Sequence, residues 1–124
     1  MLMRTRVLNN IEFEHIGFAE DIIPDNQKLS LFRIVQEQLN NIIKHSGAKN
    51  VSIKLFSKTD EFVLEIGDDG KGFDPACHRK GIGILNIKSR AELFNGKVEI
   101  ISQPGHGCLL TVSFPLSLPN AADN

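Results

Sequence analysis

Residues 27–67, QKLSLFRIVQEQLNNIIKHSGAKNVSIKLFSKTDEFVLEIG, decide the fold, because a long helical pattern runs directly into two alternating segments. Within residues 27–46, apolar side chains recur at spacings of four, four and three, which predicts an amphipathic helix. Residues 50–56 and 61–67 alternate apolar with polar side chains around a short polar connection, so we expect a β-hairpin. The predicted apolar stripe of the helix consists of Leu31, Val35, Leu39 and Ile42.

The rest of the chain adds three strands and one helix to this centre. Residues 11–18 predict a first strand, residues 84–94 predict a second helix, and residues 97–102 and 108–114 predict a final pair of strands. The charged, glycine-rich residues 68–83 predict a loop. Because strands and helices do not alternate strictly, we expect an α/β (α+β) two-layer sandwich. In it, helices pack on one face of a mixed sheet of about five strands.

Composition limits the class of protein. The 124 residues suit one domain, which we expect over residues 11–116, with a lead-in or linker remnant at 1–10 and a flexible tail at 117–124. A net charge of −1 argues against direct nucleic-acid binding and against a polybasic membrane module. No apolar run has the length of a membrane span or a signal peptide. The two cysteines, Cys77 and Cys108, form no CxxC motif, which suits a reducing, cytoplasmic compartment.

A polar stripe borders the apolar stripe of the long helix. At 100° per residue, Glu37, Asn41 and Lys44 share one side of the helix, and His45 lies next to them. Oxygen ligands beside a cationic side chain could hold a hydrated Mg²⁺ with its phosphates, and Glu37 could orient or deprotonate a nucleophile. A solvated helix face is the alternative interpretation.

Three glycine clusters follow. In residues 68–74, DDGKGFD, the glycines Gly70 and Gly72 would let a flat ligand approach the backbone, and Asp68 could accept a hydrogen bond from an exocyclic amino group. A tight turn is the alternative. Residues 81–86, GIGILN, open a helix whose N-terminal N–H groups could bind phosphate. They match neither a dinucleotide fingerprint nor a P-loop. Residues 105–108, GHGC, also suit a plain hairpin turn.

The order of these motifs carries more information than any one of them. RIVQEQLNNIIKHSGA, DDGKGFD, GIGILNIKSRAELFNG and PGHGCLLTVSFP together resemble the ATP-binding catalytic domain of sensor histidine kinases. This family belongs to the GHKL superfamily of histidine kinase-like ATPases, and the resemblance covers about residues 27–116. It implies a Bergerat-type fold with about three helices on one face of the sheet. It also implies ATP and Mg²⁺ as cofactors, and a very short lid over residues 74–80.

The resemblance also implies the role of individual residues. Asn41 would coordinate Mg²⁺ and, with Glu37, act in catalysis, whereas Asp68 would bind the amino group of adenine. The motif usually has Thr or Ser where Cys108 stands, and a thiol is a weak hydrogen-bonding group. The implied ATP-binding residues are Asn41, Lys44, His45, Asp68, Gly70, Gly72, Phe73, Gly81, Ile82, Gly83, Cys108 and Thr111.

A histidine kinase also needs a phosphoacceptor histidine, which in this family usually precedes Glu or Asp. The four histidines here precede Ile16, Ser46, Arg79 and Gly107. We therefore expect this chain to bind ATP–Mg²⁺ without labelling itself, and to be monomeric when isolated. The phosphate would go to a dimerisation and phosphoacceptor domain, upstream of residue 1 or on a partner chain, and then to a response regulator. The alternatives are a free-standing Ser/Thr kinase of the anti-sigma-factor type and a non-catalytic module that acts by protein contact.

Overall fold

The structure is a computed structural model that describes residues 10–16, 23–58, 60–72 and 84–116. Its strands are β1 (Asn10–Ile16), β2 (Asn50–Lys58), β3 (Glu61–Asp68), β4 (Lys97–Ser102) and β5 (Cys108–Pro115). Its helices are α1 (Asp25–Asn41), which continues into a π-helical turn, η2 (Ile42–Ser46), and α2 (Ile84–Glu92). None of these described helices has the length and apolar character needed to cross a bilayer.

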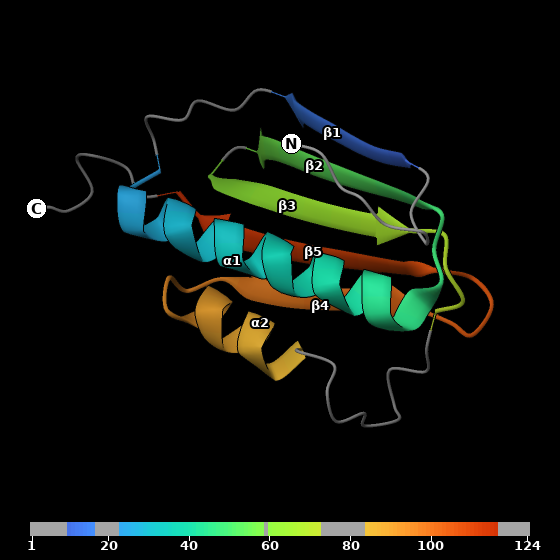
Figure 1. The fold of residues 1–124 in the computed structure, drawn as a ribbon. Coiled ribbons are helices and arrows are strands. Elements are labelled where there is room, and N and C mark those ends of the chain that lie inside the picture. The colour runs from blue at the N-terminus through green and yellow to red at the C-terminus, as the bar shows by residue number, and fades with distance from the viewer. Residues whose placement is uncertain (1–9, 17–22, 59, 73–83, 117–124) are drawn as a thin grey trace, which may run out of the picture.

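The five strands form one mixed sheet in the order β1-β2-β3-β5-β4. β1 pairs with β2 in parallel, and the other three pairs are antiparallel. Both helices lie on the same face of the sheet (Figure 1). The predicted two-layer sandwich is confirmed, with a smaller number of helices. The described residues contain two α-helices instead of about three, and the third had come from the resemblance without a helical pattern of its own.

The two predicted hairpins are confirmed, with longer strands than expected in the first. β2 and β3 pair as far as Lys58 and Glu61, so their connection is shorter than the predicted one over residues 57–60. The core lies between the sheet and the helices. Phe62 on β3 and Phe114 on β5 stack there with their ring centroids 5.0 Å apart. On α2, Ile87 and Ala91 are fully buried against this core.

The buried face of α1 differs from the predicted stripe. Leu31 and Ile42 are buried, but Val35 and Leu39 are only half-buried. Ile34 is the most deeply buried residue of the helix at 0% exposure. The inner face also contains polar residues, which hid its true centre from a search for apolar spacing. The buried residues of α1 are Gln27, Leu31, Ile34, Gln38 and Asn41.

Candidate functional site

The candidate site lies at one end of the sheet, on the right in Figure 1, where three segments distant in sequence meet. These are the end of α1 with η2, the residues after β3, and the turn between β4 and β5. The N–H of Lys71 donates to the carbonyl oxygen of Ser46 at 2.9 Å, and the N–H of Gly105 donates to the carbonyl oxygen of Lys71. Hydrogen bonds therefore tie the segment after β3 to both neighbours.

Asp68 is the last residue of β3, and its side chain lies on the face that the helices cover. The alternate residues Phe62, Leu64 and Ile66 are all buried on that face, and Asp68 continues their phase. Burial raises the pKa of the Asp68 carboxyl. The hydrogen bond from the N–H of Gly70 to Oδ1, at 2.8 Å, opposes this effect, and the charge of Asp69 adds to it. Asp68 is therefore a half-buried carboxyl group at the end of β3, at the edge of the core.

The segment after β3 passes very close to the end of the helix. A Cβ atom at Gly70 would lie 2.6 Å from Oγ and 2.7 Å from Cβ of Ser46. A side chain at position 70 would therefore push the segment away from η2 and move Asp68 with it. This close approach explains the glycine without reference to any ligand.

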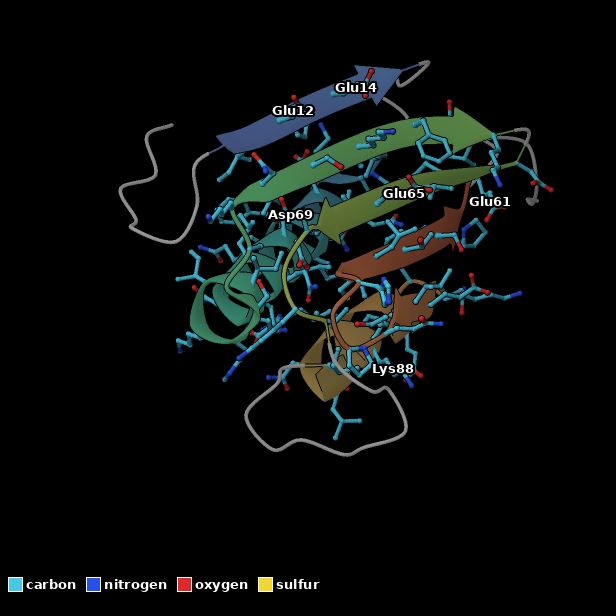
Figure 2. The ribbon with its side chains drawn as sticks, turned by 90° about the vertical axis from the view of Figure 1, so that its right-hand side faces the viewer. Glu12, Glu14, Glu61, Glu65, Asp69 and Lys88 are labelled. Atoms are coloured by element: carbon cyan, nitrogen blue, oxygen red, sulfur yellow. The ribbon has the colours of Figure 1, made fainter. Side chains whose placement is uncertain are left out.

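Asp69 fixes the start of β2 beside the end of β3 (Figure 2). Its Oδ1 accepts hydrogen bonds from the N–H groups of Lys49 at 2.9 Å and Asn50 at 3.0 Å, and Oδ2 accepts one from Nδ2 of Asn50 at 2.7 Å. These bonds, led by those from Asn50, lower the pKa of Asp69 to about 2. Asp69 is thus an ionised residue with a structural role, which joins the end of β3 to the start of β2 next to Asp68.

Cys108 lies beside Asp68 in the sheet. It pairs with Asp68 on one side and with Ser102 on the other, which makes a row of three side chains on the helix-covered face. Burial, together with the charge of Asp68, raises the pKa of the Cys108 thiol to about 11, against an opposing hydrogen bond with Ser102. Ser102 also donates from Oγ to the carbonyl oxygen of Gly107 at 2.9 Å. The row therefore presents the carboxyl group of Asp68, a thiol that is neutral at neutral pH, and a hydroxyl.

The end of α1 contributes the second group of polar residues. Asn41 is buried, and its Nδ2 donates to Oε1 of Gln38 at 3.2 Å. Glu37 lies one turn before Asn41 and is half-buried, whereas Lys44 and His45 are exposed. The prediction placed Asn41 on a side face of the helix, and the structure moves it to the inner face.

After Asn41 the helix widens into the π-helical turn η2, a feature found often at functional sites. Ser46 ends it by two hydrogen bonds of its hydroxyl, which donates to the carbonyl oxygen of Ile42 and accepts from the N–H of Ala48, both at 2.9 Å. Gly47 follows in the left-handed conformation with φ 66°, as expected for a glycine after a helix.

The structure brings some of the predicted site residues together and separates another from them. Asp68, Gly70, Gly72 and Cys108 gather at one end of the sheet, next to the helix end that contains Asn41, Lys44 and His45. Thr111 lies elsewhere. It pairs with Glu65 and Glu99 in a row on the opposite, helix-free face, because side chains alternate along β5. Phe73, Gly81, Ile82, Gly83 and the predicted lid over 74–80 lie outside the described residues.

Four residues of this end were not among the predicted site residues. Ser46, Asp69 and Ser102 act through hydrogen bonds with the main chain, which leave no spacing pattern in a sequence. Gln38 is a polar residue on a buried helix face, so its position becomes visible only when the inner face is known.

A hollow of about 550 Å³ opens at this end on the helix-free face. Ser52, Gly67 and Leu109 form its floor across the three central strands, and no residue of α1 lines it. Asp68 and Cys108 also line this hollow where their strands end, but Asn41 does not. Among the described residues no three His, Cys, Asp or Glu side chains converge to hold a metal ion.

Comparison with known proteins identifies the family. Residues 26–118 match the model of the histidine kinase-, DNA gyrase B- and HSP90-like ATPases, and the chain belongs to this family. ATP is therefore the nucleotide that it uses.

The particular relatives are sensor kinases. The signal transduction histidine-protein kinase/phosphatase DegS of Brevibacillus brevis is 34% identical over 108 residues, which are 86% of this chain and 28% of that protein. UhpB of Salmonella typhimurium, a histidine-protein kinase/phosphatase by the same description, is 34% identical over 117 residues, 88% of this chain and 23% of that protein. The chain thus spans about a quarter of the length of these relatives.

Solved structures agree on the fold. The histidine kinase AdeS of Acinetobacter baumannii superposes with a TM-score of 0.73 at 15% identity, over 89% of this chain and 56% of that one. At this identity the likeness concerns the architecture alone.

Proposed function

We propose that this chain is the ATP–Mg²⁺-binding catalytic domain of a two-component sensor histidine kinase, and that it donates the γ-phosphate of ATP to a histidine on a dimerisation domain. The observation that carries the proposal is the position of Asp68, a half-buried carboxylate at the end of β3 beside a close-packed glycine. The four motifs and the family support it.

Asp68 would recognise the base. An ionised carboxylate accepts a hydrogen bond from the exocyclic amino group of adenine, and a partly desolvated one does so with less competition from water. Gly70 and Gly72 would shape the pocket around the ring. Cys108 would form the floor beside Asp68, and its neutral thiol would replace the hydroxyl that the motif usually supplies there.

The end of α1 would hold the phosphates. The donor set suits Mg²⁺, because Asn41 offers an amide oxygen and phosphate oxygens and waters can supply the other ligands, while Glu37 lies one helical turn away. When bound, the ion would offset the charge that develops on the transferred phosphoryl group. Lys44 and His45 would line the phosphate and ribose side. Gly81, Ile82 and Gly83 would contribute backbone N–H groups, and Phe73 would lie against the nucleotide, as the sequence predicts.

The reaction would be an in-line phosphoryl transfer. A nitrogen atom of the acceptor imidazole forms a bond to the γ-phosphorus, the bond from that phosphorus to the bridging oxygen breaks, and ADP leaves. Glu37 would take up the imidazole proton as general base. The acceptor histidine, the response regulator and a cytoplasmic location belong to the proposal for the longer protein. Domain limits of 11–116 and a monomeric isolated domain also belong to it.

Calorimetric titration with ATP and ADP, with and without Mg²⁺, tests the proposal on the parent and on Asp68→Asn. We expect Mg²⁺-enhanced binding by the parent and at least tenfold weaker binding by the variant, because an amide NH₂ would face the adenine amino group. Absence of binding by the parent at millimolar nucleotide would contradict the proposal and favour a non-catalytic module.

A second assay tests the acceptor. Incubation of the chain with γ-labelled ATP should leave it unlabelled, because none of its histidines is followed by an acidic residue. Strong self-labelling on a histidine would refute this part of the proposal. Transfer to Ser or Thr of a partner protein would favour the anti-sigma-factor type of kinase.

A further inference from the structure

Two amide side chains lie on the buried face of α1, one turn apart. Gln38 is 4% exposed and Asn41 is 8% exposed. A buried amide without a hydrogen-bond partner is destabilising by about 1–3 kcal/mol, so a pair of amides at such positions has to be arranged. One hydrogen bond joins the two side chains.

The hydrogen bond between them has a direction. Nδ2 of Asn41 donates to Oε1 of Gln38 at 3.2 Å. The amide group of Asn41 has one NH₂ and one oxygen, and rotation by 180° about its terminal bond would exchange them. With its NH₂ held by an acceptor one turn earlier, Asn41 keeps Oδ1 pointing away from Gln38.

The main-chain carbonyl of Gln38 also accepts a hydrogen bond next to Asn41. The N–H of Ile42 donates to the carbonyl oxygens of Gln38 and Leu39, at the point where α1 ends and the π-helical turn η2 begins. Gln38 therefore anchors both the side chain of Asn41 and the backbone of the next residue, through its two carbonyl oxygens.

We propose that Gln38 is a positioning residue for the cation site, and that it orients the amide of Asn41 so that Oδ1 faces the Mg²⁺–phosphate group. This inference rests on the proposed function, in which Asn41 is a ligand of the ion. Mg²⁺ takes oxygen ligands, and an NH₂ group in the same place would repel it. In this role Gln38 would act through Asn41, without contact to the nucleotide or the ion.

The test separates Mg²⁺-dependent from Mg²⁺-independent binding. ATP is titrated by calorimetry in excess Mg²⁺ and in EDTA, with the parent, Gln38→Leu and Gln38→Met. Both variants remove the amide acceptor at similar volume, and the unbranched Met variant preserves the test if the Leu variant folds poorly. We expect affinity in Mg²⁺ to fall three- to tenfold and affinity in EDTA to change less than twofold, as for the loss of one hydrogen bond.

Gln27→Leu is the matched control. Gln27 is also a buried glutamine on the inner face of α1, but it lies about four turns from Asn41, near the other end of the helix. We expect this variant to keep the parent's affinity in both conditions. An equal loss in Gln27→Leu would mean that the effect comes from the helix as a whole and would overturn the proposal.

A double variant tests whether Gln38 acts through Asn41. Asn41→Ala should abolish most of the Mg²⁺ enhancement, and adding Gln38→Leu to it should cause no further loss. Additive losses would contradict the positioning role, and so would an unchanged Mg²⁺ enhancement in Gln38→Leu. Either result leaves the proposed function intact if the parent binds ATP–Mg²⁺. A parent that binds no ATP removes both.

Discussion

The turn between β4 and β5 offers a comparison of two glycines that differ in one physical respect. Gly105 has φ 82° and Gly107 has φ 77°, so alanine at either position pays the strain of a left-handed backbone. At Gly105 nothing lies within 4 Å of an added Cβ. At Gly107 the Cβ would overlap the carbonyl oxygen of Asp68, far closer than the 3.0 Å that real Cβ atoms keep.

The expected magnitudes follow from these distances. Gly105→Ala should lower the free energy of unfolding by about 1–2 kcal/mol, which is the cost of the left-handed conformation. Gly107→Ala adds overpacking of about 1–3 kcal/mol, for a total of about 2–5 kcal/mol. Because the overlap is with the backbone of Asp68, Gly107→Ala should also weaken ATP binding, whereas Gly105→Ala should leave it within about twofold.

Urea unfolding followed by circular dichroism measures the first effect, and calorimetric ATP titration of the folded variants measures the second. Equal destabilisation by the two substitutions would refute the reasoning, because strain would then explain both and the contact with Asp68 would contribute nothing. Gly107→Ala that is destabilised but binds ATP as the parent does would show that the turn does not position Asp68.

Three further predictions concern other parts of the molecule. Asp69→Ala should destabilise the fold above about pH 4, because the hydrogen bonds to Asp69 stabilise its ionised form and so lower its pKa to about 2. The difference in stability from the parent should shrink as the pH falls from about 4 towards 2. Urea midpoints over this pH range measure it, and a constant difference would contradict it. Phe114→Ala should lower the unfolding free energy by about 3–5 kcal/mol, and Phe32→Ala, at a side chain 58% exposed, by less than about 1 kcal/mol. In a Cys77→Ser background, Cys108 should react with iodoacetamide at pH 8 at least about 100-fold more slowly in the native protein than in urea, because burial raises its pKa to about 11; equal rates would rule out a buried thiol.

The strands were predictable because their signal is local. In β5, buried and half-buried residues alternate from Cys108 to Phe114, and the glycines before Cys108 mark the turn. The inner face of α1 was less predictable, because several of its buried residues are polar. Gln38 and Asn41 are buried and hydrogen-bonded to each other. A search for apolar spacing passes over them, and it therefore placed the predicted stripe on Val35 and Leu39. A widening of the helix after Asn41 has no sequence signature that we recognise.

The candidate site shows the same division. Asp68 and its glycines were predicted as site residues because a strand end followed by an acidic, glycine-rich segment is a recognisable pattern, and they do lie together at one end of the sheet. Thr111 was misjudged in position, since the motif order gives proximity along the chain, and the alternation of side chains places it on the other face from Cys108. Ser46 was missed because its main-chain carbonyl, a group that every residue has, accepts from Lys71, and because its hydroxyl bonds with main-chain groups.

The parallel pairing of β1 with β2 has a consequence for the order of folding. It joins residues forty positions apart, from Asn10 with Asn50 to Ile16 with Phe56, whereas β2–β3 and β4–β5 are hairpins closed by short turns. Closing the longer loop costs more chain entropy before any contact is gained. We expect the hairpins to form first and β1 to dock late, onto an edge that the other four strands have already built. All described residues of the candidate site follow β1 in the sequence, so this site can assemble before the sheet is complete.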